Sequence, residues 1–228
     1  MPLCEKSSSI AWRPNGRKDA EMVKGWYART VLPRLLDWAL DREALAAHRR
    51  RQLAPAHGMV LEIGFGTGLN IPCYPAAVEH LTAVDSNPGM TRYAHERIIG
   101  SPLVVVHRIG RAERLPMMNE SFDCVVSTLT LCSIPDVAQA LKELYRVLKP
   151  GGQFLFLEHG LSQDPEVQRW QHRLTPFSKI LGDGCHLNRN IPTLITGQGF
   201  AVDSLETGYL EEAPKVTGYF YRGIANKR

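Results

Sequence analysis

Apolar and polar residues follow two different patterns along the chain, and the change falls near Pro55. Before this point, apolar residues recur at near-helical spacing with Arg and Lys between them, which predicts a long amphipathic helix. The apolar positions of this helix are Trp26, Val31, Leu35, Trp38 and Leu45. Beyond Pro55, short β-rich runs alternate with helical ones, which is typical of a parallel sheet with crossover helices. We therefore expect an N-terminal helical extension or lid over residues 1–57 and one α/β domain over residues 58–228.

The α/β part divides into strands and helices at its turn signals. The expected strands span residues 59–63, 80–85, 103–109, 122–127 and 153–158, and the expected helices span residues 69–74, 88–99, 136–148, 165–181 and 191–198. Residues 149–152, Lys-Pro-Gly-Gly, are expected to end a helix and start the next strand. Two further β-like runs, FAVDSLETGY and KVTGYFYRGIANK, are expected to be antiparallel neighbours that close the sheet.

The composition is that of an ordinary soluble globular protein, with 44% hydrophobic and 22% charged residues. No run approaches the roughly 18 apolar residues of a membrane span. The first residues lack the apolar core of a secretory signal, and their acidic residues argue against an organelle transit peptide. We therefore expect a cytoplasmic protein.

The cysteines are odd in number, widely spaced and without a CxxC pair. This spacing predicts neither a disulfide framework nor a zinc site, so we expect no metal and reduced thiols in or near the core. The five residues are Cys4, Cys73, Cys124, Cys132 and Cys185.

The formal charge of +4 is unevenly placed, since residues 1–57 carry 11 Lys and Arg against 6 Asp and Glu. A basic amphipathic helix can lie on a membrane surface, or it can pack on the main domain with solvated arginines. No motif of a nucleic-acid reader is present, so we expect no nucleic-acid partner. Membrane contact is expected to be peripheral at most, and the oligomeric state stays open.

The stretch VLEIGFGTGLN places Gly64, Gly66 and Gly68 directly after a predicted strand. Glycine there lets a ligand approach the bare backbone. The dinucleotide fingerprint G-x-G-x-x-G needs its third glycine one residue later, and the Gly-Lys-Ser/Thr of a phosphate-binding P-loop is absent. Glu62, just before the loop, favours a ligand with a cationic end. Asp85, at the end of the next predicted strand, is placed to accept hydrogen bonds from ribose hydroxyls.

With AVDSNPGM, GRAERLP, FDCVVS and LKELYRVLKPGGQFLFLEHG, this loop resembles the class I S-adenosylmethionine (SAM) dependent methyltransferases over residues 60–160. The resemblance implies a Rossmann-like fold with a seven-stranded, mostly parallel sheet, an antiparallel last strand, helices on both faces and an N-terminal helical cap. It also implies SAM as the cofactor. The implied cofactor contacts are Glu62, Gly64, Gly66, Gly68, Asn70, Asp85, Ser86, Met90, Ala112, Glu113, Thr128 and Leu129.

A second set of motifs, namely LCS, EH, a Trp-Gln pair and D-G-C-x-L-x-R, resembles the methyltransferase-like thiol S-methyltransferases. That group of membrane-associated enzymes methylates small alkyl thiols, which implies a small thiol as acceptor, with a thioether and S-adenosylhomocysteine as products. Phospholipid and quinone-ring methyltransferases share much of this frame, so an amphipathic acceptor stays open, as does a non-catalytic SAM-binding protein. The group's hydrophobic N-terminal anchor is replaced here by the basic helix.

His159, at a strand end, is the first candidate for a proton acceptor because imidazole titrates near neutrality. Its alternative role is a structural hydrogen bond. The candidate acceptor-binding residues are Tyr27, Cys132, Trp170, His172, Cys185, His186 and Arg189. Structural alternatives exist for these too: Cys185 as a buried thiol, Trp170 in a helix core, and Arg189 paired with Asp183.

Overall fold

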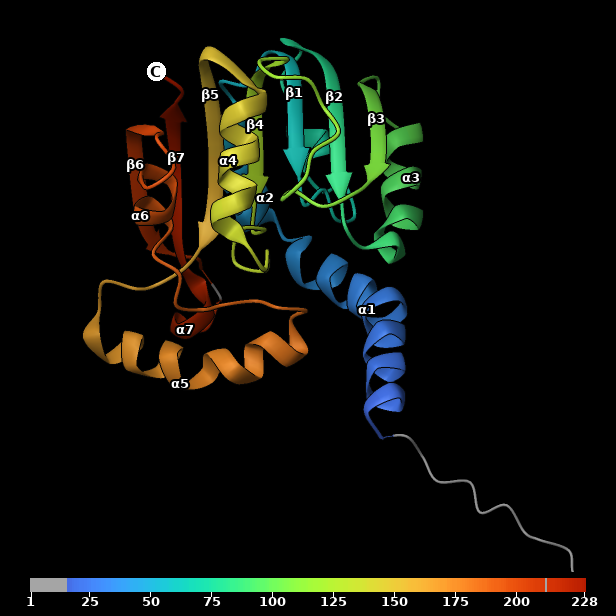
Figure 1. Ribbon diagram of the computed structural model, residues 1–228, viewed down its shortest axis with the longest axis vertical. Helices are drawn as coiled ribbons and strands as arrows, with labels where there is room; N and C mark the ends of the chain where they lie inside the picture. Colours follow the sequence, from blue (N-terminus) through green and yellow to red (C-terminus); the bar gives the residue numbers. More distant parts are fainter. Residues whose placement is uncertain (1–15, 212) are drawn as a thin grey trace, which may run out of the picture.

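The computed structural model describes residues 16–211 and 213–228, with side-chain environments from residue 25 onward (Figure 1). Cys4 and the expectations about the first residues lie outside the described part. The helices are α1 (Gly16–Leu40), α2 (Glu43–Leu53), α3 (Thr91–Ile99), α4 (Val137–Val147), α5 (Pro165–Leu181), α6 (Ile191–Thr196) and α7 (Lys215–Gly218), with 3₁₀ turns η1 (Ile71–Cys73) and η2 (Pro88–Met90). The strands are β1 (Gly58–Ile63), β2 (Val78–Asp85), β3 (Val104–Ile109), β4 (Phe122–Thr128), β5 (Leu148–His159), β6 (Ala201–Tyr209) and β7 (Tyr219–Asn226).

The strands form one seven-stranded sheet in the order β3-β2-β1-β4-β5-β7-β6. The strands β1 to β5 pair in parallel, whereas β7 runs antiparallel to both β5 and β6. The expected mostly parallel sheet and the closing antiparallel pair are therefore confirmed. In this register Ile63 lies between Val84 and Ser127, so β1, β2 and β4 end side by side.

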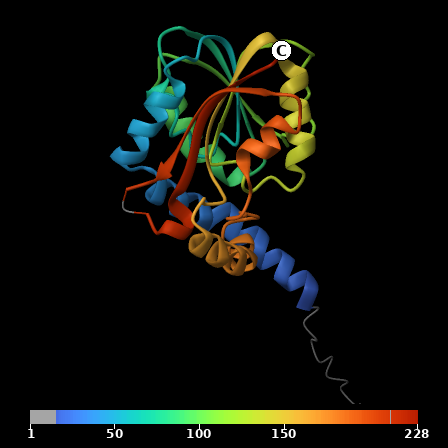
Figure 2. The same cartoon turned by 90° about the vertical axis from the view of Figure 1, so that its left-hand side faces the viewer.

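Helices cover both faces of the sheet because successive strand residues point to opposite sides. Phe154 and Phe156 belong to one apolar cluster, which includes residues of α4 and α6. Leu155, between them, belongs to the other cluster, which includes residues of α2 and α3. Figure 2 views the sheet along its edge, with α4 and α6 on one side.

The helices α1 and α5 lie beyond the carboxyl ends of the parallel strands (Figure 1). The hydroxyl of Tyr27 on α1 donates to the carbonyl of Leu181 at the end of α5, at 3.2 Å. Asn87 Nδ2 donates to the carbonyl of Ala28 at 2.7 Å, which attaches α1 to the loop after β2. Across the described helices, none has the combined length and apolar character that crossing a membrane requires.

The N-terminal helical pattern differs from the expectation in two ways. The chain leaves the helical conformation after Leu40, and Arg42 is extended (φ −126°, ψ 142°), so the pattern forms two helices rather than one. The predicted apolar stripe also faces solvent over much of its length, since Trp26 and Trp38 are 61% and 69% exposed. The helix packs instead through the neighbouring stripe that contains the buried Leu32, because tertiary contacts select the face that a helix buries.

Two local expectations also need correction. Residues 69–74 form only the short turn η1, since the segment IPCYP holds two prolines that interrupt helical hydrogen bonding. Residues 149–152 do follow the end of α4, but they lie within β5 rather than before it. Gly151 N donates to the carbonyl of Lys227 at 2.9 Å, and Lys227 N donates to that of Gly152 at 3.1 Å, which explains the early start of the strand.

Candidate active site

The glycine loop after β1 folds against the ends of β2 and β4. Gly64 adopts φ +64°, and a Cβ there would lie 2.1 Å from Thr130 Oγ1, so this position requires glycine. Gly66 also has a positive φ, and its N–H donates to Asp85 Oδ2 at 2.7 Å. The loop is therefore held by the residue that the sequence analysis assigned to ribose binding.

A cleft of about 310 Å³ opens beside this loop at the carboxyl edge of the sheet. All the residues expected to contact a cofactor line it, with the exception of Gly68. Gly68 lies behind the loop, where its N–H donates to the carbonyl of Phe65 at 3.0 Å. Motifs that are separate in the sequence thus meet at one cavity in the fold.

The cleft lining includes a group of three buried polar or ionisable residues, which are Arg49, Glu62 and Asn70. Asn70 Nδ2 donates to Glu62 Oε1 at 2.9 Å, and the hydroxyl of Tyr74 donates to Glu62 Oε2 at 2.6 Å. Burial raises the pKa of Glu62 to about 8, against the smaller lowering by these two hydrogen bonds. Arg49 Nε and Asn70 Oδ1 are buried without a hydrogen-bond partner within the described part of the chain. Both residues line the cleft.

Asp85 also lines the cleft and is largely desolvated. Its Oδ1 accepts from Asn87 N at 2.7 Å, in addition to the bond from the glycine loop. Burial raises the pKa of Asp85, and the two backbone donors offset part of this effect. Each carboxylate oxygen retains acceptor capacity for a further donor.

Glu158, near the end of β5, holds the loop that follows β4. Its carboxylate accepts from Ser127 Oγ at 2.6 Å, from Thr130 N at 2.9 Å and from Leu131 N at 3.1 Å. Burial raises the pKa of Glu158, and the donors lower it by less. Because Thr130 lines the cleft, this buried carboxyl group fixes part of the cleft wall.

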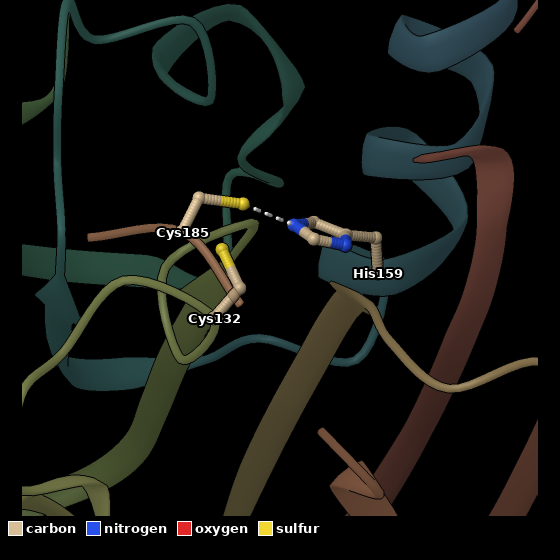
Figure 3. A group of neighbouring side chains, drawn as sticks. All are labelled: Cys132, His159 and Cys185. Carbon is tan, nitrogen blue, oxygen red and sulfur yellow. Dashed lines mark hydrogen bonds between the residues drawn. The ribbon is translucent and has the colours of Figure 1, made fainter. Parts of the chain in front are cut away.

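Three potential ligand atoms meet beside this wall, in the group formed by Cys132, His159 and Cys185 (Figure 3). Their two sulfur atoms and one ring nitrogen all lie within 4.8 Å of one another. His159 Nε2 is 3.1 Å from Cys185 Sγ, and its Nδ1 is buried with no hydrogen-bond partner among the described residues. The hydrogen bond to Cys132 and burial raise the pKa of Cys185. The group does not line the cleft, although Ser133 and Asp183 beside it do.

The expectation of no metal rested on the wide spacing of the cysteines, but in the folded chain two of them lie beside His159. Cys132 lies in the turn after β4, His159 ends β5, and Cys185 lies in the loop between α5 and α6. Because these residues are far apart in the sequence, their spacing gave no sign that the fold brings them together.

The other residues expected at the acceptor site lie outside the cleft lining. Trp170 on α5 is 54% exposed, so its alternative placement in a helix core is wrong too. His172 on the same helix is exposed and lies beside Asn188. Arg189 donates to the carbonyl of Leu131, and the described ion pairs do not join it to Asp183. His186 N donates to the carbonyl of Cys132 at 2.9 Å. Tyr27 bridges α1 and α5.

Several cleft residues have no sequence signal that points to them. Arg49 lies in the run HRRR, which suggests only a basic helix, and its burial depends on the docking of α2. Three residues of α1 cover the cleft from the other side. They are Leu32, Leu36 and Leu40, and the loop residues Thr130, Ser133 and Asp183 are among the other lining residues that were not expected.

Residues 61–156 match the family model described as "Methyltransferase domain". This part of the chain is similar to a methyltransferase domain. The matched residues run from β1 to β5 and include the glycine loop and Asp85. The resemblance to class I methyltransferases that the sequence motifs indicated is thereby confirmed.

Curated relatives of the chain include thiol S-methyltransferases and demethylmenaquinone methyltransferases. The chain is 37% identical over 134 residues to rat thiol S-methyltransferase TMT1B, and 35% identical over 134 residues to human thiol S-methyltransferase TMT1A. Each match covers 57% of this chain and 54% of the relative. Demethylmenaquinone methyltransferase of Listeria monocytogenes is 29% identical over 137 residues, which are 60% of this chain and 52% of that protein. The chain spans about half the length of the curated relatives that it matches.

Solved structures agree on the fold. A SAM-dependent methyltransferase from Methanosarcina mazei superposes with a TM-score of 0.58 at 22% identity, covering 74% of this chain and 91% of that one. The [4+2]-cyclase SpnF superposes with a TM-score of 0.66 at 16% identity, covering 96% of this chain and 98% of its own. The chain therefore has the Rossmann-like fold of these proteins, and a protein named a cyclase shares it, so the fold alone does not define the reaction.

Proposed function

We propose that the chain binds SAM in the cleft and transfers the methyl group of SAM to a small thiol. The observation that carries the proposal is the buried end of the cleft, where a cation, a carboxyl group and an unpartnered amide oxygen lie together. They belong to Arg49, Glu62 and Asn70. A guanidinium beside a carboxyl group that can ionise suits an amino-acid zwitterion, which is what the methionyl end of SAM presents.

These residues fit the cofactor through their unsatisfied atoms. Asn70 Oδ1 and the carboxylate of Glu62 can accept hydrogen bonds from an ammonium group, and Arg49 can hold a carboxylate. A buried polar atom without a partner is costly, so filling these positions is favourable. Asp85 is proposed to accept from ribose hydroxyls, with Ala112 and Glu113 on the adenine side.

The division of the chain into a lid over residues 1–57 and a methyltransferase domain over residues 58–228 is part of the proposal. Its support is that Leu32, Leu36 and Leu40 of α1 line the cleft. An apolar cover excludes water from a bound cofactor, which protects a reactive ligand and strengthens the electrostatic interactions beneath it.

When bound, SAM supplies a methyl group on a sulfonium, which a soft nucleophile can accept. A thiol suits this chemistry because its pKa of about 8.5 makes the nucleophilic thiolate accessible near neutral pH. The names of the two thiol S-methyltransferase relatives support a thiol acceptor for this chain. The chain's own contribution is to hold the acceptor sulfur in line with the methyl group and to exclude water.

The test is an assay of the purified full chain with methyl-labelled SAM and separate acceptors. The panel holds small alkyl thiols, a phenol, an amine, phosphatidylethanolamine vesicles and a quinol, and products are identified by mass spectrometry. Labelled thioether is the expected result. SAM binding without label in any acceptor would favour a non-catalytic role and overturn the proposal.

An amphipathic acceptor, such as a phospholipid headgroup or a quinol, is the second candidate. Exposed apolar side chains on the two helices beyond the carboxyl edge of the sheet favour it. On α1 they are Trp26 and Trp38, and on α5 they are Trp170, Phe177, Ile180 and Leu181. The named demethylmenaquinone methyltransferase relative also supports this candidate. Label on the quinol or lipid alone, with none on thiols, would establish it in place of the thiol.

A further inference from the structure

The group of Cys132, His159 and Cys185 has the composition of a transition-metal site. Each residue offers one ligand atom, and the three come from different segments of the chain. Two thiols and one imidazole form a ligand set that favours zinc, and three protein ligands leave one position open, as in catalytic zinc sites. The group holds no fourth protein ligand among the residues that the structure describes.

The geometry of the group fits a single ion. Zn–S bonds of about 2.3 Å and Zn–N bonds of about 2.0–2.1 Å place tetrahedral ligand atoms roughly 3.5–3.8 Å apart. The three atoms here lie within 4.8 Å of one another, and His159 Nε2 is 3.1 Å from Cys185 Sγ. The two thiol groups and the imidazole face a common point between them (Figure 3). Side-chain adjustments of less than an ångström or so bring the atoms to bonding geometry.

Backbone contacts hold the group together in advance of any ion. His186 directly follows Cys185 in the chain, and its backbone N–H donates to the carbonyl of Cys132 at 2.9 Å. The guanidinium of Arg189 donates to the carbonyl of Leu131, directly before Cys132. The loop between α5 and α6 is therefore attached at two points to the turn after β4, and Glu158 holds that turn from the sheet side. Such preorganisation lowers the cost of assembling a metal site.

The group also adjoins the proposed methyl-transfer site. Cys132 Sγ donates to the carbonyl of Leu129 at 3.7 Å, and Leu129 lines the cleft. Ser133 and Asp183, which flank the group in sequence, line the cleft as well. Cys185 is only partly buried, so its side of the group is open to a further ligand.

We propose that Cys132, His159 and Cys185 bind one zinc ion, whose open position takes the sulfur of the acceptor thiol. The two cysteine thiols lose their protons when the Zn–S bonds form, and the acceptor loses its own to water as its sulfur binds. Two thiolates balance the charge of Zn²⁺, and the acceptor thiolate leaves the assembly at −1. Arg189 lies near enough to interact electrostatically with Cys132 and Cys185, so its positive charge offsets this excess. Metal binding is independent of the proposed function, whereas the acceptor's role as fourth ligand rests on it.

The test begins with metal binding by the full chain, purified under a reductant that does not bind metals and dialysed against a chelator. Cobalt(II) alone is titrated as a spectroscopic substitute for zinc. We expect one ion per chain, with thiolate-to-cobalt charge-transfer absorption and the intense visible bands of tetrahedral cobalt, both abolished by added zinc. Ethanethiol is then added, and we expect the visible bands to shift as a third sulfur binds.

Matched cysteine variants locate the site. Cys185→Ser, which changes a partly buried residue, is expected to lose the charge-transfer absorption, and Cys73→Ser, a cysteine of similar burial remote from the group, is expected to keep it. Circular dichroism shows that each variant is folded. Absence of tetrahedral cobalt bands in the wild type, or equal bands in Cys185→Ser and wild type, would overturn the site.

The methylation assay separates the two proposals. Tetrahedral cobalt binding without any thioether product would leave the metal site in place and remove the thiol methyltransferase function. Thioether formation at an unchanged rate in the chelator-treated protein, verified to be metal-free, would keep that function and overturn the role of the metal in holding the acceptor.

Discussion

Asn70 donates a hydrogen bond from Nδ2 to Oε1 of Glu62 at 2.9 Å, and both residues line the cleft. Asn70 Oδ1 has no hydrogen-bond partner among the described residues. It belongs to a side chain hydrogen-bonded to a carboxyl group whose pKa is raised by burial. A ligand that brings an ammonium group to this position satisfies the amide oxygen and stabilises the carboxylate together. We therefore expect the pair to couple cofactor binding to protonation.

The first prediction concerns this coupling. Burial raises the pKa of Glu62 to about 8, and the ammonium of SAM is expected to lower it. SAM binding at about pH 7 should therefore release a proton from Glu62. Calorimetry in buffers of different ionisation enthalpy measures this release. Glu62→Gln should bind SAM more weakly and release no proton from this position, and equal release by both proteins would contradict the assignment.

The same group predicts a pH dependence of folding. Its folded pKa lies above the ordinary value of 4.5, so its contribution to stability is present in full below that pH and is lost as the pH rises through about 8. As the pH rises from 4.5 to about 8 without SAM, the free energy of unfolding of the wild type should thus fall relative to that of Glu62→Gln. Urea unfolding of both proteins across the interval checks the sign, and a parallel pH profile would refute it.

A third prediction tests the glycine loop. Gly64→Ala places a methyl group 2.1 Å from Thr130 Oγ1 at a positive φ, so it should cost about 1–2 kcal/mol for the backbone and about 1–3 kcal/mol for overpacking, and weaken SAM binding. Gly151→Ala is the matched control, because Gly151 has φ +73° with nothing within 4 Å of an added Cβ. Its cost should be the backbone part alone, with unchanged SAM affinity. Equal losses in thermal unfolding would show that the clash is relieved.

The packing of α1 gives a fourth prediction. Leu32 is 3% exposed and lines the cleft, whereas Leu35 on the same helix is 47% exposed. Leu32→Ala should destabilise the docked helix by about 2–5 kcal/mol and weaken SAM binding, and Leu35→Ala should change the stability by less than about 0.5 kcal/mol. Hydrogen exchange of α1 and calorimetry with SAM measure both effects. Unchanged SAM affinity in Leu32→Ala would argue against a lid.

Glu158 supplies the fifth prediction. Glu158→Gln replaces one acceptor oxygen by an amide donor beside two backbone N–H groups, which should cost about 1–3 kcal/mol and loosen the turn after β4. Glu79→Gln, at an exposed position on β2, should stay within about 0.5 kcal/mol of the wild type. Denaturant unfolding gives the energies. Exchange of the amides of Thr130 and Leu131 reports on the turn, and unchanged protection there would mean that other contacts hold it.

The sequence by itself determined the parts of the protein whose physics is local. The glycine loop follows a strand directly, and Asp85 ends the next strand, so the parallel arrangement alone brings them to one edge. The alternation of apolar runs and helical patterns likewise indicated the succession of strands and helices along the chain, because each element must bury its own apolar face. The convergence of these residues on one cleft could be predicted for this reason.

Only the tertiary structure decided which distant segments meet. Arg49 reaches the cleft because α2 docks on the sheet, and Leu32 covers it because α1 buries a stripe other than the one with the most aromatic residues. Cys132 and Cys185 lie far apart in the chain, and they meet because hydrogen bonds attach one loop to another. Contacts of this kind depend on the packing of whole elements, which leaves no periodic pattern in the sequence.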